Sequence, residues 1–128
     1  MSVTNFLMSW GMLLLGVVMN IGGIYIIKMR INSLGAVQFD SVKSVVMFFV
    51  SILTSPLAVF GGIITVLACL PYAIAISKLE LSIAYPLSVA LSCLIVVPLT
   101  AIYFGEGITA NKMIGIAMIL GSLYFLYK

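Results

Sequence analysis

Charged side chains are scarce in this sequence. Its 128 residues include six Lys or Arg, three Asp or Glu and no His, so that 7% of the chain is charged, against roughly 25% in an ordinary globular domain. Such a chain cannot cover a soluble surface with polar groups. Disorder is excluded for the opposite reason, because 64% of the residues are hydrophobic and disordered chains are poor in apolar side chains. The composition therefore predicts an integral membrane protein.

The lack of histidine also limits the chemistry that the chain can perform. Histidine is the commonest general base, and without it no Ser-His or Cys-His nucleophile pair can form. The two cysteines, Cys69 and Cys93, lie in apolar runs, and two isolated Cys without His do not make an ordinary zinc site. Six dispersed basic residues are too few for a nucleic-acid-binding surface. We expect no enzyme, no cofactor, no metal and no nucleic-acid partner.

Long apolar runs fill most of the chain. A helix that crosses a bilayer needs about 20 such residues. The first run has neither the basic start nor the cleavage site of a signal peptide, so we expect an uncleaved helix there. Residues 1–128 are predicted to form a single four-helix transmembrane domain. The four predicted spans are Phe6–Ile27, Leu57–Ser77, Leu81–Gly105 and Ile108–Tyr127.

A short additional helix is expected between the first two spans. The charge-free stretch Ser44–Ser77 is too long for one span, and Thr54-Ser55-Pro56 interrupts it, because an N-cap followed by Pro is typical of a helix start. The remainder, Ser44–Leu53, is too short to cross. Its wide apolar face suits the lipid–water interface or a shallow re-entrant position. The predicted fold is all-α, with four transmembrane helices plus this interfacial or re-entrant helix.

The basic residues are divided unequally between the two ends of the predicted spans. The first and third connections share one side and hold Lys28, Arg30, Lys43 and Lys112. The second connection and the C-terminus hold only two basic residues. Because cytoplasmic segments are enriched in Lys and Arg, this division favours an orientation with both termini outside.

Each of the first three spans places small and polar residues on one face. At about 100° per residue, Asn20 aligns with Gly16 and Gly23, and Gly61 aligns with Thr65. One interpretation is helix packing, since small residues let helices approach closely. The other is a polar cavity, since amides and phenols need partners in hydrocarbon. The residues expected to line this cavity are Asn20, Tyr72, Tyr85, Ser88 and Ser92.

The fourth span also has a stripe of small residues. Ala117 and Gly121 form a small-xxx-small pair, a pattern that favours close helix contact. The stripe predicts either a dimer contact or a contact within the chain. Its members are Gly115, Ala117, Gly121 and Ser122.

Two segments resemble small transporters of the drug/metabolite superfamily. Lys78–Pro86, which reads KLELSIAYP, is similar to their loop-to-third-helix motif. Phe104-Gly105-Glu106 followed by Ile114–Gly121 resembles the end of their third helix and their fourth helix. Within this superfamily, small multidrug resistance proteins are dimers of four-helix chains, and they use a carboxylate in the first helix for protons and cationic substrates. The resemblance puts Asn20 at that position, and an amide exchanges no proton near neutral pH.

The chain is closest in character to the subunits of the undecaprenyl-phosphate-aminoarabinose flippase, which also lack the carboxylate and have an extended region after the first helix. This resemblance implies translocation of a polyprenyl-phosphate-linked sugar across the bacterial inner membrane. The working unit would be a homodimer, or a heterodimer with a related four-helix chain. The anionic headgroup would need cations near the interface, here Lys28, Arg30 and Lys43.

Two alternatives remain at this stage. One is a multidrug-resistance-like exporter of small cations that works with a carboxylate-bearing partner chain. The other is a membrane scaffold that transports nothing.

Overall fold

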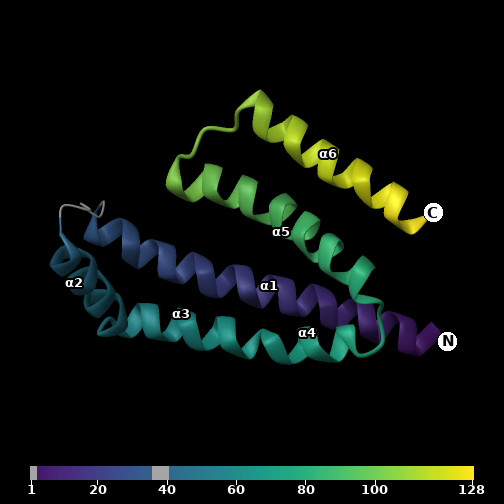
Figure 1. Ribbon diagram of the computed structural model, residues 1–128, viewed down its shortest axis with the longest axis horizontal. Coiled ribbons are helices and arrows are strands. Elements are labelled where there is room, and N and C mark those ends of the chain that lie inside the picture. The colour runs from purple at the N-terminus through teal and green to yellow at the C-terminus, as the bar shows by residue number, and fades with distance from the viewer. Residues whose placement is uncertain (1–2, 36–40) are drawn as a thin grey trace. The chain divides into compact units, whose positions relative to one another are not determined.

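The chain is helical almost throughout. The computed structural model describes residues 3–35 and 41–128, and no strand occurs in these ranges, so the predicted all-α class is confirmed. Three helical stretches are long and apolar enough to cross a membrane: Val3–Leu34, Pro56–Ile76 and Leu81–Phe104. In chain order the helices are α1 (Val3–Leu34), α2 (Val42–Leu53), α3 (Pro56–Leu67), α4 (Cys69–Ile76), α5 (Leu81–Phe104) and α6 (Ala110–Tyr127) (Figure 1).

α1 is longer than the predicted span and continues past Ile27 to Leu34. Lys28 and Arg30 therefore lie within the helix, because a charged side chain does not interrupt backbone hydrogen bonding. The Ser33 hydroxyl donates to the Arg30 carbonyl at 2.7 Å and accepts from Arg30 Nη1 at 3.2 Å. Gly35 follows with φ of 81°, a left-handed conformation that glycine adopts without strain and that commonly ends helices.

The short helix between the first two spans is present as α2. Ser41 precedes it, and the Ser41 hydroxyl accepts a hydrogen bond from the backbone N–H of Ser44 at 3.3 Å, which satisfies a free donor of the first turn. The predicted interruption is confirmed. Thr54 ends α2, and α3 begins at Pro56, where the missing N–H is harmless.

The predicted second span is one apolar stretch with a break that the sequence analysis did not place. α3 ends at Leu67 and α4 starts at Cys69, with Ala68 between them. Pro71 has no N–H to donate to the carbonyl of Leu67, four residues earlier. The interruption lies three residues before Pro71, and the stretch still runs from Pro56 to Ile76.

The helices belong to two compact units, and α1 contributes to both. The first unit contains residues 1–18 and 70–128. Its core joins Leu13 of α1, Ala75 of α4 and Ala84 of α5, all buried, with Trp10 and Tyr72 packed against them. α5 ends at Gly105 with φ of 64°, and α6 then packs alongside α5 (Figure 1).

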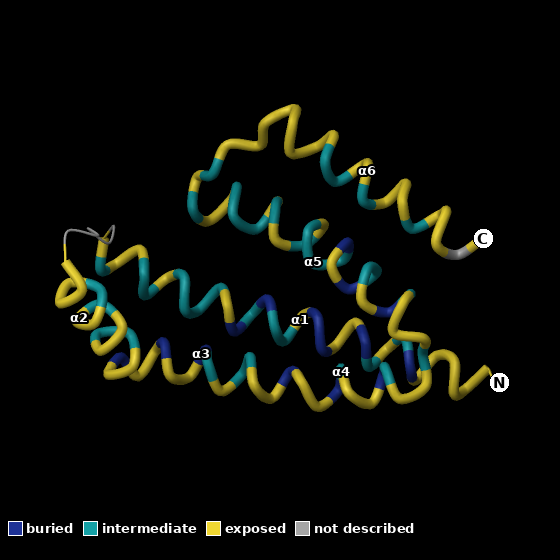
Figure 2. Tube along the Cα trace, in the orientation of Figure 1, coloured by how far each residue is buried: buried dark blue, intermediate teal, exposed yellow. Residues whose placement is uncertain are grey.

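The second unit contains residues 19–69, which are the rest of α1, all of α2 and α3. α1 and α3 approach closely where Gly23 faces Gly61. A Cβ atom added to Gly61 would lie 2.7 Å from the carbonyl oxygen of Gly23. α2 packs on α3, and none of its residues is buried (Figure 2).

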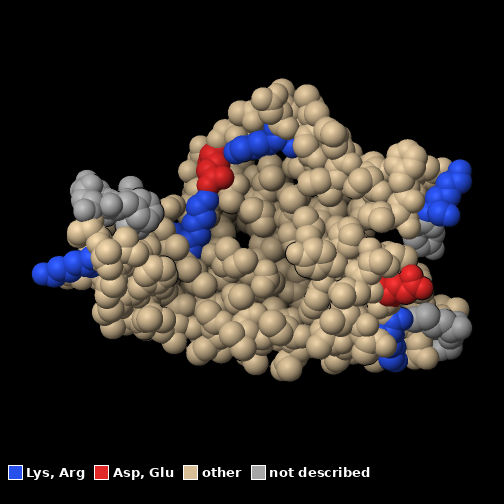
Figure 3. All heavy atoms as spheres, in the orientation of Figure 1, with Lys and Arg blue, Asp and Glu red and all other residues tan. Residues whose placement is uncertain are grey.

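Large apolar side chains lie on the outside of these helices. Val42, Ile102 and Phe125 are 82%, 76% and 79% exposed, and charged atoms occur at only a few places on the face seen in Figure 3. Contiguous exposed apolar surface marks an interface with lipid or protein. The surface therefore agrees with the three stretches that are long enough to span a membrane.

Candidate functional site

The five predicted cavity residues are divided between the two units. Asn20 lies in the second unit, half-buried and one turn before Gly23 on α1. Tyr72 lies on α4, and Tyr85, Ser88 and Ser92 lie on α5, all in the first unit. Each unit thus has its own polar groups, and the common cavity stays a prediction.

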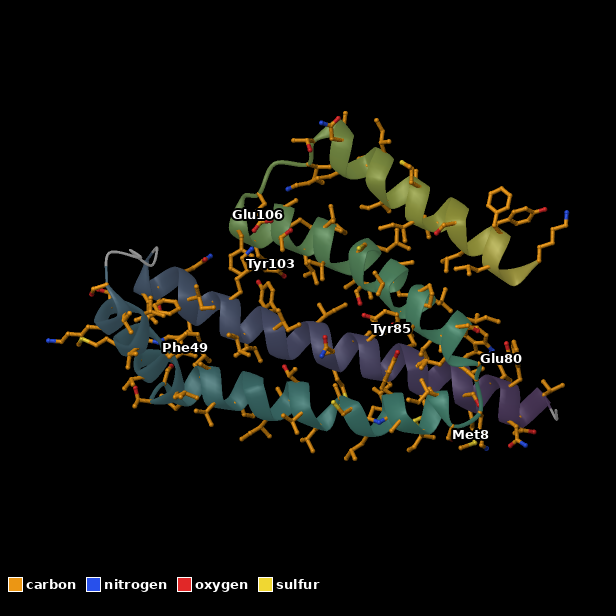
Figure 4. The ribbon with its side chains drawn as sticks, in the orientation of Figure 1. Met8, Phe49, Glu80, Tyr85, Tyr103 and Glu106 are labelled. Atoms are coloured by element: carbon orange, nitrogen blue, oxygen red, sulfur yellow. The ribbon has the colours of Figure 1, made fainter. Side chains whose placement is uncertain are left out.

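The polar residues of α5 form a chain of hydrogen bonds within the helix. Ser88 Oγ donates to the carbonyl of Tyr85 at 2.7 Å, and Ser92 Oγ donates to the carbonyl of Ser88 at 2.7 Å. The hydroxyl protons are therefore engaged, and the oxygen lone pairs can still accept hydrogen bonds. Tyr85 is 61% exposed (Figure 4). Ser88 is buried and Ser92 is half-buried, so the phenol of Tyr85 is the most accessible of these three polar groups.

Two aromatic side chains in the first unit carry buried polar atoms without a partner. Tyr72 Oη and Trp10 Nε1 are both buried, and neither has a hydrogen-bond partner within the described part of the chain. An unsatisfied buried polar group costs about 1–3 kcal/mol, so each such group needs an explanation. Sequence reasoning selected Tyr72 and missed Trp10. The available signal was that Trp10 is the only tryptophan, a residue enriched at membrane interfaces.

The three predicted phosphate-binding cations belong to the second unit. Lys28 and Arg30 lie near the end of α1 and are half-buried, and Lys43 is exposed in the first turn of α2. Arg30 Nη1 donates to Ser33, whereas Arg30 Nε is buried and has no hydrogen-bond partner among the described residues. The Nε atom is closed to a ligand, so an anion would have to bind at the terminal nitrogens of the Arg30 guanidinium. That Lys28, Arg30 and Lys43 together form one phosphate-binding site stays a prediction.

An apolar groove lies in the same unit as these cations. Its volume is about 490 Å³, within the range of about 300–1,000 Å³ that small-molecule sites occupy. Ile27, which lines it from α1, directly precedes Lys28. We call it the α2–α3 groove, and its lining residues are Ile27, Ile52, Leu53, Ala58, Val59, Gly62, Ile63, Val66 and Leu67.

The predicted dimer contact on α6 is uncovered in the chain. Ala117, Gly121 and Ser122 are exposed, and Gly115 is half-buried. A Cβ atom added at Gly115 or Gly121 would meet nothing within 4 Å. This face is open to a second helix, and the dimer stays a prediction.

Lys112, counted among the cations that favour one orientation, is held near the start of α6. Its Nζ donates to the carbonyl of Gly107 at 3.0 Å, and its backbone N–H donates to the Thr109 hydroxyl at 3.4 Å. The Lys112 side chain therefore folds back on the loop after α5.

Metal-ligating side chains do not gather in the part of the chain that the structure describes, where no group of three or more His, Cys, Asp or Glu occurs. The fold and these surfaces define an all-α chain with three stretches long and apolar enough to span a membrane. Comparisons with protein-family models, curated proteins and solved structures found no match.

Proposed function

We propose that this chain is a multi-pass protein of the bacterial inner membrane that translocates a polyprenyl-phosphate-linked sugar. In this proposal α1, the α3–α4 stretch, α5 and α6 are the four spans, and α2 lies at the interface or enters the membrane part-way. α6 has 18 residues, a length of about 27 Å at 1.5 Å per residue. That is slightly less than the roughly 30 Å of a bilayer core, so the residues before α6 would complete this span.

The observation that carries the proposal is the presence of apolar and cationic surfaces in one unit. The α2–α3 groove is lined by aliphatic residues and Gly62, and its Ile27 is adjacent in the chain to Lys28. Arg30, two residues further, is half-buried and carries a guanidinium whose Nη1 donates to Ser33. A polyprenyl phosphate combines a long apolar chain with an anionic headgroup. Arg is suited to such a headgroup because its planar fork binds two phosphate oxygens.

The sugar requires hydrogen-bonding groups that carry no charge. In the unit that holds the groove and the cations, the chain offers the Asn20 amide. Asn20 also argues against proton-coupled export of cations by this chain alone, since an amide neither exchanges a proton near neutral pH nor neutralises a cation. The open small-residue face of α6 is the proposed contact with a second, identical or related chain.

The first test measures binding of a polyprenyl-phosphate-linked hexose to the purified protein in lipid nanodiscs. Arg30→Lys keeps the charge and removes the bidentate fork. We expect it to weaken binding by about tenfold, which corresponds to about 1.4 kcal/mol. Lys78→Gln removes a cation from the opposite connection and is expected to leave binding unchanged.

A vesicle assay then measures movement of the same lipid between leaflets. We expect translocation by the unaltered chain and a loss in Arg30→Lys that follows its binding. If Arg30→Lys and the unaltered chain bind the lipid equally, the cations only set the orientation of the chain in the membrane and do not bind the headgroup. Resistance to hydrophobic cations without lipid translocation would favour an exporter.

A further inference from the structure

The short helix α2 has an apolar face that is left exposed in the described part of the chain. At about 100° per residue, spacings of four, three and four residues bring four apolar side chains to one side of the helix. Their exposed fractions lie between 53% and 82%. Phe48 and Ile52 are only partly exposed and form the neighbouring side, and Ile52 lines the groove between α2 and α3. We call the exposed row the Phe49 stripe, and its members are Val42, Val46, Phe49 and Leu53.

The opposite side of α2 is polar from its first turn to its last. Lys43 and Ser44 lie in the first turn, and Ser51 lies in the last turn. Thr54, which ends the helix, lies on the same side, and Met47 is the apolar residue among them. A helix with one apolar and one polar side suits the plane of a lipid–water interface. A helix that entered the membrane end-on would carry one of these polar ends into hydrocarbon, where such groups are costly.

The position of α2 in the chain places it at a membrane boundary. The stretch Pro56–Ile76 has 21 residues, a length of about 32 Å at 1.5 Å per residue, and a bilayer core is about 30 Å thick. If this stretch crosses the membrane, Pro56 lies at the edge of the hydrocarbon, and α2 ends three residues earlier, at Leu53. In Figure 1 α2 crosses from the end of α1 to the start of α3 and does not run back along either helix.

We propose that the Phe49 stripe inserts between the acyl chains of one leaflet, with the axis of α2 parallel to the membrane plane and Lys43 among the lipid headgroups. Apolar side chains gain free energy by leaving water, and an ammonium group is attracted to anionic headgroups. Of the two positions considered for α2, interfacial and re-entrant, this selects the interfacial one. The inference rests on the membrane insertion proposed above and is independent of translocation.

A second copy of the chain fits this face less well than lipid does. Four side chains of this size offer on the order of 500 Å² of apolar surface. A stable protein–protein interface buries about 800 Å² on each partner, so the stripe is too small to hold two copies together. Acyl chains require no minimum area, because the bilayer is assembled without this protein.

The experiment places a single tryptophan at chosen positions of the full chain, in which the only native tryptophan is removed by Trp10→Phe. Val42→Trp and Phe49→Trp lie on the Phe49 stripe, seven residues or about 10 Å apart along the helix axis. Met47→Trp is the matched control on the polar side. The proteins are reconstituted in phosphatidylcholine vesicles. Their acyl chains carry bromine, a quencher of tryptophan fluorescence, either near the headgroup or near the methyl end.

The two stripe variants should report the same shallow depth. We expect bromine near the headgroup to quench Val42→Trp and Phe49→Trp equally, and about twofold more strongly than bromine near the methyl end, because interfacial helices insert their apolar side by about 5–10 Å. Iodide present in the water on both sides of the bilayer is expected to quench Met47→Trp more strongly than either stripe variant.

Three outcomes would overturn the proposal. A re-entrant α2 would place Val42 and Phe49 at depths that differ by up to about 10 Å, so that bromine near the methyl end would quench one variant and not the other. Equal iodide quenching of all three variants would show that the stripe lies in water. Bromine quenching that falls as the protein-to-lipid ratio rises would assign the stripe to a second copy.

One further variant tests the premise of membrane insertion. Leu70 is 62% exposed and lies well inside the stretch Pro56–Ile76, so bromine near the methyl end should quench Leu70→Trp in the same Trp10→Phe chain. If it does while iodide quenches the stripe variants, the inference about α2 is wrong and insertion stands. If bromine does not quench Leu70→Trp, the insertion on which both proposals rest is wrong. Translocation is measured separately in its own assay.

Discussion

At the scale of single residues, most hydroxyl groups in the apolar helices bond to their own helix. Ser9 donates to the carbonyl of Asn5 at 2.8 Å, and Thr65 donates to that of Gly61 at 2.9 Å. Such i to i−4 bonds satisfy a hydroxyl without a neighbouring helix. The Asn20 amide has two donors and one acceptor group, more than one backbone carbonyl can satisfy. The Asn20 amide can therefore also bond to a group outside its own helix.

Replacing Asn20 by leucine distinguishes a role of the amide in sugar binding from a role in helix packing. If the amide binds the sugar, Asn20→Leu abolishes translocation in the vesicle assay and leaves insertion and folding intact, which is the result we expect. Ser9→Ala is the matched control, because the Ser9 hydroxyl bonds within its own helix. A fall in the free energy of unfolding by about 0.6–2 kcal/mol, the range for hydrogen bonds between membrane helices, would instead assign Asn20 to packing.

At the scale of helices, the contact between α1 and α3 depends on two glycines. A Cβ atom on Gly23 would overlap Thr65 Oγ1, and it would lie 2.5 Å from the carbonyl oxygen of Gly61. A backbone oxygen cannot rotate away as a side chain can, so the helices would have to separate. At Gly23 and Gly61, the small residues of these two helices thus serve close packing. This was one of the two interpretations of the sequence pattern.

Gly23→Ala is expected to destabilise the protein by about 1–3 kcal/mol, the usual range for overpacking. Gly22→Ala is the control, since its added Cβ would meet nothing within 4 Å and alanine is the better helix former by about 1 kcal/mol. Unfolding followed by circular dichroism in detergent measures both variants. A Gly23→Ala protein as stable as Gly22→Ala would show that α1 and α3 do not pack through this pair.

At the scale of the whole molecule, carboxyl groups and histidine are absent from the three apolar stretches. The chain has no His, and Glu80 and Glu106 lie in the connections before and after α5 (Figure 4). Asp40, the third acid, lies outside the described residues. A proton-coupled mechanism by this chain alone would need a titratable group within the spans.

Substrate binding should therefore depend little on pH. We expect the affinity for a polyprenyl-phosphate-linked hexose to change by less than about twofold between pH 5 and 8, the interval in which His would titrate. This phosphodiester keeps its charge over that interval, so a binding isotherm at each pH reports on the protein. A steep dependence on one proton would contradict the prediction and point to a coupled carboxylate.

The sequence by itself determined the helical class, the apolar stretches and most of their limits. The break at Thr54-Ser55-Pro56 and the end of α5 at Gly105 follow from proline and glycine, which act on their immediate neighbours. The length of α1 was underestimated, because the apolar run ends before Lys28 whereas the helix continues to Leu34, just before Gly35. The break at Ala68 does not follow from Pro71 alone, since α5 continues through Pro86 and Pro98.

Only the tertiary structure decided which residues meet. Gly23 lies against Gly61 and Thr65, and Trp10 shares a cavity with Leu87 and Leu123, although these partners are far apart in the sequence. Periodicity gives the face of each helix and leaves open which other helix covers it. Hydropathy accumulates along one segment, whereas close approach and an unpaired buried N–H depend on the side chains that several segments bring to the same place.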